Sequence, residues 1–132
     1  MTNDTGFMSR HILLVEDNII NQTLVANLLR RSGHKVTVAN DGLESLNLSA
    51  AEKFDIVIMD VQMPVMDGLE ATRQIRKREQ ETGGHLPIVA LTANLQGDDI
   101  KDCHESGMDD HLGKPVDIDV LLEVIQRYTS GS

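Results

Sequence analysis

Short apolar runs alternate along the chain with longer stretches in which apolar residues recur at helical spacing. Apolar runs predict buried strands over residues 11–15, 56–59 and 87–91, a short run predicts a strand over 36–39, and a short, mixed run predicts a fifth strand over 109–112. The helical spacing predicts helices over residues 19–32, 43–50, 68–79, 95–106 and 117–128. Five strand–helix repeats are typical of an α/β protein with a parallel sheet. We therefore expect a doubly wound (βα)5 fold, a five-stranded sheet between two layers of helices.

Residues at the ends of these segments support the predicted boundaries. Asn18 and Asp117 are placed to cap the first and last helices, and Gly33 and Gly107 are placed to end the first and fourth. Helix 95–106 is poor in large apolar residues, which predicts shallow packing. The expected organisation is a disordered leader over residues 1–10, one domain over 11–128 and a tail over 129–132.

Composition limits the class of protein. The 132 residues suffice for one domain, and an aromatic content of 2% predicts an aliphatic core. The apolar runs are far shorter than the roughly 20 residues of a membrane helix, which favours a cytoplasmic protein. A net charge of −9 argues against nucleic-acid binding. The single Cys103 excludes an internal disulfide and is expected half-buried. Four histidines without ligand spacing are expected at the surface or at strand edges: His11, His34, His85 and His104.

Reactive side chains follow the predicted strands directly. Glu16 and Asp17 follow the first strand, Asp60 the third, Thr92 the fourth and Lys114 the fifth. The carboxyl ends of parallel strands lie along one edge of a sheet, where α/β proteins bind their ligands. Three carboxylates, a hydroxyl and an ammonium at one edge predict a site for a metal ion and a phosphoryl group.

Four segments around these residues resemble the receiver domains of two-component signalling. They are Leu13-Leu14-Val15-Glu16-Asp17-Asn18, Met59-Asp60-Val61-Gln62-Met63-Pro64-Val65-Met66-Asp67-Gly68, Ala90-Leu91-Thr92-Ala93 and Gly113-Lys114-Pro115. Each motif alone is weak, but the four occur in order and each at a strand end. The resemblance covers residues 11–128, implies a flavodoxin-like fold, and is strongest to the receivers attached to hybrid histidine kinases.

The resemblance implies a role for each acidic residue. Asp60 is expected to accept the phosphoryl group, since a carboxylate can act as a nucleophile and form an acyl phosphate. Glu16, Asp17 and Asp60 are expected to hold Mg²⁺ or Mn²⁺ together with the backbone carbonyl of Gln62. Asp17 is expected to be a direct ligand.

The resemblance also implies which residues contact the phosphoryl group and respond to it. Lys114 is expected to contact its oxygens, aided by a cis bond to Pro115. Thr92 is expected to act as the switch hydroxyl, with the backbone N–H of Ala93 beside it. His111 stands where the family usually has an aromatic switch residue.

The implied partner is a histidine kinase or a histidine phosphotransfer domain. Helix 19–32 is expected to dock it through Ile20 and Leu24, beside Pro115. Residues 95–128 form the expected output face, through which self-association is a further expectation. We expect no contact with nucleic acid or membrane, and a cytoplasmic location, either free or as the cytoplasmic part of a membrane-bound kinase.

Three other functions remain open from the sequence. A Mg²⁺-dependent aspartyl-phosphate hydrolase needs a second Asp two residues after the nucleophile, where Gln62 stands. A flavin-binding electron carrier needs a Ser/Thr-rich loop after the first strand and aromatic residues beside the ring. A receiver that only binds a partner would not need the full set of Asp17, Asp60, Thr92 and Lys114. As an isolated domain, the expected chemistry is limited to self-phosphorylation and self-dephosphorylation.

Overall fold

The computed structural model describes residues 9–61, 66–93 and 98–129. Its strands are β1 (His11–Val15), β2 (Lys35–Ala39), β3 (Ile56–Asp60), β4 (Ile88–Thr92) and β5 (Asp110–Gly113). Its helices are α1 (Ile19–Arg31), α2 (Gly42–Ala51), α3 (Gly68–Thr82), α4 (Asp98–Ser106) and α5 (Ile118–Thr129). Strand and helix alternate throughout, and the predicted fold class is confirmed.

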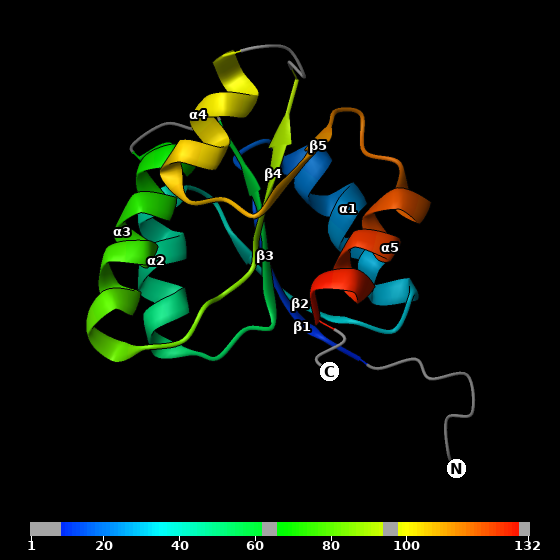
Figure 1. Ribbon diagram of the computed structural model, residues 1–132. Coiled ribbons are helices and arrows are strands. Elements are labelled where there is room, and N and C mark those ends of the chain that lie inside the picture. Colours follow the sequence, from blue (N-terminus) through cyan, green and yellow to red (C-terminus); the bar gives the residue numbers. More distant parts are fainter. Residues whose placement is uncertain (1–8, 62–65, 94–97, 130–132) are drawn as a thin grey trace.

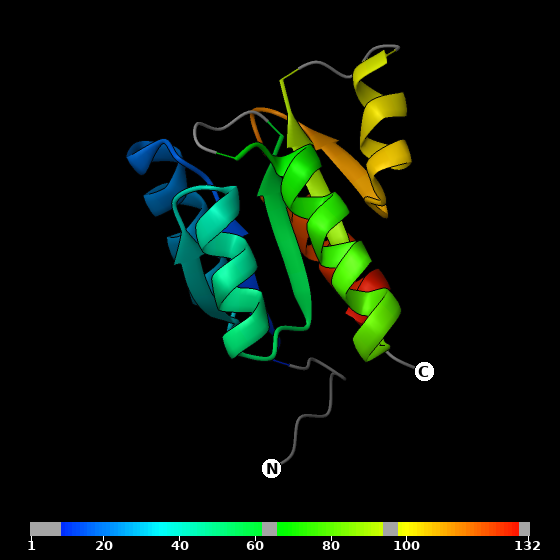
Figure 2. The same ribbon diagram turned by 90° about the vertical axis from the view of Figure 1, so that its left-hand side faces the viewer.

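The five strands form one parallel sheet in the order β2-β1-β3-β4-β5. Helices α1 and α5 cover one face, and α2, α3 and α4 cover the other, which gives three layers (Figure 1). Figure 2 shows α2 and α3 side by side in front of the sheet. The order of the strands reverses between β1 and β3, and the carboxyl ends of such a pair open onto a crevice.

The core consists of one apolar cluster on each face of the sheet. β3 and β4 are buried along their whole length, and β1 is buried from Ile12 to Val15. The buried side chains of both clusters are aliphatic or contain sulfur, apart from Phe54. The prediction of an aliphatic core around β1, β3 and β4 is therefore confirmed.

Polar side chains define the starts of the helices. The Oδ1 atom of Asn18 accepts hydrogen bonds from the backbone N–H groups of Ile20 and Asn21, both at 3.0 Å, as expected for an N-cap. Asp117 accepts in the same way from the N–H of Asp119 at 2.9 Å. Both predicted caps are confirmed.

The predicted end of α3 is three residues too early. The helix continues to Thr82 and stops at Gly83, whose φ of 83° is in the region that favours glycine. The last turn is polar and exposed, so it carries no apolar periodicity from which its helical state could be predicted.

Two burial predictions are wrong. Cys103 is 1% exposed, because it lies in the apolar cluster between α4 and the sheet. His34 is 8% exposed, and its Nδ1 atom accepts a hydrogen bond from the backbone N–H of Arg10 at 3.1 Å. A backbone donor from a neighbouring segment therefore lets a histidine be buried at the start of β2.

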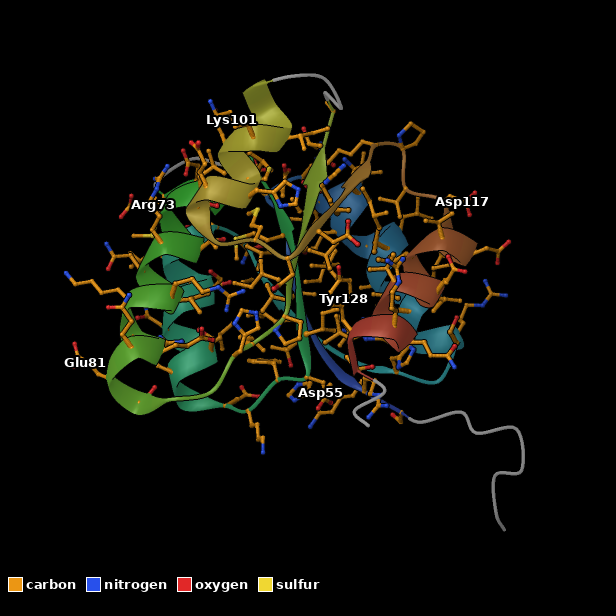
Figure 3. The ribbon with its side chains drawn as sticks, viewed as in Figure 1. Asp55, Arg73, Glu81, Lys101, Asp117 and Tyr128 are labelled. Atoms are coloured by element: carbon orange, nitrogen blue, oxygen red, sulfur yellow. The ribbon has the colours of Figure 1, made fainter. Side chains whose placement is uncertain are left out.

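The two ends of the sheet differ. β3 and β4 point their carboxyl ends upward in Figure 1, whereas β1 begins and α5 ends at the lower side. Tyr128 lies beside the sheet at the end of α5 (Figure 3), and its hydroxyl donates to the Asp109 carbonyl at 3.2 Å. Within the described ranges, every helix is too short or too polar to span a bilayer.

Candidate functional site

The register of the sheet aligns the ends of four strands. Val15 of β1 pairs with Met59 of β3, and Thr92 of β4 pairs with Gly113 of β5. The residues that follow, or that close these strands, therefore meet at one edge. The structure brings Glu16, Asp60 and Lys114 into direct contact there.

Three carboxylates form a cluster at this edge. Glu16, Asp17 and Asp60 each offer an oxygen, and these oxygens all lie within 4.8 Å of one another. Glu16 and Asp60 are buried, at 2% and 5% exposure, whereas Asp17 is exposed. Carboxylate oxygens at this spacing repel one another, and a hard divalent cation bound between them would relieve the repulsion. Such a cation would be open to solvent on the side of Asp17.

Lys114 lies between the two buried carboxylates. Its Nζ atom donates to Oδ2 of Asp60 at 2.7 Å and lies 3.4 Å from Oε1 of Glu16. Burial alone would lower the pKa of Lys114, but the hydrogen bond and the charges of Asp60 and Glu16 raise it above its usual value. The side chain is therefore held as a cation beside the acids.

Glu16 is held differently from Asp60. Burial raises its pKa, and the charge of Asp60 adds to this, while a hydrogen bond from the backbone N–H of Asn18 opposes it. That N–H lies 3.1 Å from Oε2 of Glu16. Glu16 is thus tied to the N-cap residue of α1 as well as to Lys114.

Backbone hydrogen bonds fix the loops that carry these residues. The N–H of Lys114 donates to the carbonyl of Thr92 at 2.9 Å, and the N–H of Glu16 donates to that of Ala39 at 3.1 Å. The Lys114–Pro115 peptide bond is cis, as the resemblance implied. Thr92 is 5% exposed as the last residue of β4, and the exposed Ala93 follows it.

Two glycines pack directly against the segment that follows Asp60. A Cβ atom on Gly68 would lie 2.3 Å from the carbonyl oxygen of Asp60, and one on Gly42 would lie 2.3 Å from that of Met66. Their own N–H groups donate to the carbonyls of Val61 and Met66 at 2.9 and 3.0 Å. The starts of α2 and α3 therefore pack at van der Waals distance against the backbone of Asp60 and of Met66.

Two of the residues singled out in the sequence lie elsewhere or cannot be placed. His111 pairs with Ala90 along β5, and its ring meets the ring of His104 edge to face at 5.6 Å between centroids. It faces α4 rather than the acid cluster. Gln62 lies outside the described residues.

One residue close to the site carries no motif and escapes the sequence analysis. Gln22 is 8% exposed on α1, and its Nε2 atom donates to the carbonyl of Glu16 at 2.8 Å and to Oδ1 of Asn40 at 2.9 Å. The buried face of α1 comprises Gln22, Val25, Ala26 and Leu29. A single amide at an otherwise apolar, inward-facing position is the signal that could have revealed it.

A groove of about 370 Å³ runs from the site along α1. Glu16, Asn21 and Lys114 line one part of it, and apolar residues line the rest. These are Leu24, Val25, Leu28, Leu91, Pro115, Val116 and Ile118. On the same helix Ile19, Ile20 and Leu24 are 66%, 74% and 57% exposed. Of the predicted docking residues, Leu24 and Pro115 thus share one groove, and Ile20 lies on the same helix.

Fold and site together define an α/β domain with a cluster of acids and a lysine at one edge of a parallel sheet, and comparison with known proteins gives its family. The family model described as "Response regulator receiver domain" matches residues 12–126. The chain belongs to this family. It is 42% identical over 119 residues to hybrid signal transduction histidine kinase I of Dictyostelium discoideum, covering 86% of this chain and 7% of that protein. The chain spans between 7% and 15% of the length of the curated relatives it matches.

Two solved structures illustrate the likeness. One is the receiver domain of a sensor histidine kinase from Pseudomonas aeruginosa PAO1 with a magnesium ion coordinated in its active site cleft. It has a TM-score of 0.85 and 39% identity, with 94% of this chain and 100% of that chain covered. The other is a Saccharomyces cerevisiae response regulator receiver domain in complex with a histidine phosphotransfer signalling protein. Its TM-score is 0.90 at 33% identity, with 94% of this chain and 91% of that chain covered.

Proposed function

We propose that this domain accepts a phosphoryl group from a phosphohistidine onto Asp60 as one step of a phosphorelay. The observation that carries the proposal is the contact of Lys114 with the buried carboxylate of Asp60 at 2.7 Å, inside a cluster that also holds Glu16 and Asp17. An ammonium and three carboxylates in contact at a sheet edge suit phosphoryl transfer better than any role in stability, since burying charges is costly.

The chemistry follows from these contacts. A carboxylate oxygen of Asp60 forms a bond to phosphorus while the phosphorus–nitrogen bond of the phosphohistidine breaks, and the leaving imidazole keeps the bonding electrons and takes up a proton. Lys114 then exchanges its contact with Asp60 for one with a phosphoryl oxygen. Glu16, Asp17 and Asp60 fit Mg²⁺ or Mn²⁺, which would neutralise charge on the transferring group. The magnesium-bound relative supports this choice of ion.

Thr92 and Ala93 complete the proposed site. They stand at the end of β4, next to Lys114, whose N–H already bonds to the Thr92 carbonyl. A new phosphoryl group would offer acceptors to the Thr92 hydroxyl and the Ala93 N–H. The arrangement in which those bonds form would then gain population. His111 is proposed to respond through α4, against whose His104 its ring packs.

Mass spectrometry tests the proposal. Incubation with acetyl phosphate and Mg²⁺ should add one phosphoryl group to the protein, and Asp60→Asn should abolish the gain. Asp102→Asn, an exposed position on α4, serves as the control and should retain it. A wild-type protein that gains no mass, or an Asp60→Asn variant that gains as much, would show the assignment of Asp60 to be wrong.

The groove beside α1 is the proposed docking site for the phosphohistidine partner. It leads from Lys114 to Leu24 and Pro115, and Ile20 is exposed on the same helix. The yeast receiver domain of the same fold is bound to a histidine phosphotransfer protein, which supports this class of partner. We also propose that the chain functions within a hybrid-kinase phosphorelay, whereas self-association through residues 95–128 stays a prediction.

Ile20→Glu tests this docking. It should slow transfer from a phosphorylated histidine phosphotransfer protein by about tenfold or more, since it puts a charge into an apolar interface. Phosphorylation by acetyl phosphate, which needs no docking, should be unchanged. Leu43→Glu is the matched control, because Leu43 is 45% exposed on α2, on the other face of the sheet. Equal transfer rates for the two variants would count against the groove.

A further inference from the structure

We propose that Gln22 is a positioning residue for the metal-binding acids, acting through the peptide group that joins Glu16 to Asp17. The inference rests on the proposed function and adds a role to a residue outside every motif of the site. Gln22 lies on α1, six residues after Glu16, and is buried at 8% exposure. Its side chain reaches back from the helix to the loop that carries the acids.

The amide of Gln22 makes two hydrogen bonds with one nitrogen. Nε2 donates to the Glu16 carbonyl at 2.8 Å and to Oδ1 of Asn40 at 2.9 Å. Asn40 is held in turn, because its backbone N–H and its side-chain Nδ2 donate to Oε1 of Glu44 at 2.7 and 3.1 Å. The acid loop is thereby connected through Gln22 to the loop between β2 and α2.

These contacts determine the direction in which the side chain of Asp17 points away from the backbone. The N–H of Glu16 is bonded to Ala39, so both polar groups of the Glu16 backbone are held from outside the loop. The Glu16 carbonyl belongs to the same rigid peptide plane as the N–H of Asp17. Asp17 itself is exposed, so packing does little to hold its carboxylate. Fixing that plane is therefore the means by which the fold orients Asp17 toward Glu16 and Asp60.

The chemistry of the amide explains the residue type. A methionine of similar length offers no donor, and a glutamate would place an acceptor against the Glu16 carbonyl and a charge beside the cluster. Removing a group that hydrogen-bonds to a metal-binding residue typically changes the affinity of the protein for the metal by tenfold or more. The expected effect is hence on metal binding rather than on the transfer step.

The experiment compares Gln22→Met with Gln126→Met, the same substitution at an exposed position of α5. Mg²⁺ is titrated into each unphosphorylated protein and followed by backbone amide chemical shifts. Gln22→Met should raise the half-saturating Mg²⁺ concentration by about tenfold, and Gln126→Met should leave it unchanged. The rate of phosphorylation by acetyl phosphate should need correspondingly more Mg²⁺, yet return to within about twofold of wild type at saturation.

A merely structural glutamine would give a different result. Gln22→Met would then lower the melting temperature but leave the Mg²⁺ half-saturation where it was, and that outcome overturns the proposal. If Gln22→Met does not fold, Asn40→Ala takes its place at an exposed position and should raise the half-saturation about threefold. An unchanged value in folded Asn40→Ala would equally overturn the inference.

The same data separate this inference from the proposed function. A wild-type protein that binds Mg²⁺ but gains no phosphoryl group refutes the function of Asp60, while the titration still decides the role of Gln22. A wild-type protein without any saturable Mg²⁺ response refutes both.

Discussion

Gly68 offers the sharpest test of how the site is packed. Replacing it by alanine puts a Cβ atom 2.3 Å from the Asp60 carbonyl oxygen and 3.1 Å from Cα of Val61. Ordinary contacts begin at 3.4 Å, so backbone must move by about 1 Å. Both of these atoms belong to the backbone of the Asp60–Val61 segment, which cannot rotate away as a flexible side chain would.

Two opposing effects set the magnitude. Overpacking of this kind costs about 3 kcal/mol, the upper end of its usual range, because a strand end has to shift. Alanine in place of glycine gains about 1 kcal/mol inside a helix, and at most that much at Gly68, the first residue of α3. Gly68→Ala should therefore lower the free energy of unfolding by about 2 kcal/mol. With a urea dependence of about 2 kcal/mol per molar, the midpoint should fall by about 1 M.

Urea unfolding followed by circular dichroism measures this change. The pair Asn27→Gly and Asn27→Ala, at an exposed position of α1, supplies the same chemical comparison without the clash. There the alanine variant should be the more stable by about 1 kcal/mol. A Gly68→Ala protein as stable as wild type would refute the close packing of α3 on the Asp60 loop.

Other substitutions probe features away from the acids. Burial, with the charge of Arg10, lowers the pKa of His34. As the pH is lowered below about 6.5, the imidazole is protonated in the unfolded chain before it is protonated in the folded protein. The free energy of unfolding should therefore decrease as the pH is lowered, until the folded imidazole is protonated too. Urea midpoints at pH 5 and 7.5 should therefore differ less in His34→Gln than in wild type, and an equal difference would contradict this. Arg76→Met should cost about 2 kcal/mol, because its guanidinium bonds Asp109 at 2.8 Å with both side chains at most 20% exposed. Arg73→Met, which removes a pair that is about half exposed, should leave the free energy of unfolding nearly unchanged in the same measurement, and a loss equal to that of Arg76→Met would contradict the distinction.

Residues that end a strand could be located from the sequence. Asp60 closes an apolar strand and Lys114 follows the short, mixed fifth strand, and a parallel sheet leaves no other place for such ends than one shared edge. The two residues are 54 positions apart in the chain, and their meeting at one edge follows from the predicted strand positions and the parallel topology. Motif order then supplied the family, because four weak patterns at four strand ends constrain one another.

Residues whose partners are backbone groups could not be located in this way. Gln22 donates to a carbonyl, and Arg76 donates to the carbonyls of Gly107 and Leu86 at 2.8 Å each. Every residue has a carbonyl, so no residue type marks the acceptor in the sequence. The burial of His34 escaped prediction for the same reason, since its partner is the N–H of Arg10.

The path of the chain has a consequence for how this unit can be combined with others. The first strand enters and the last helix leaves at the side of the sheet remote from the acids (Figure 1). Polypeptide joined at either point can extend away without shielding the reactive crevice. A domain with this layout can be joined to other domains at either end, and the same family occurs as a small segment of much longer kinases.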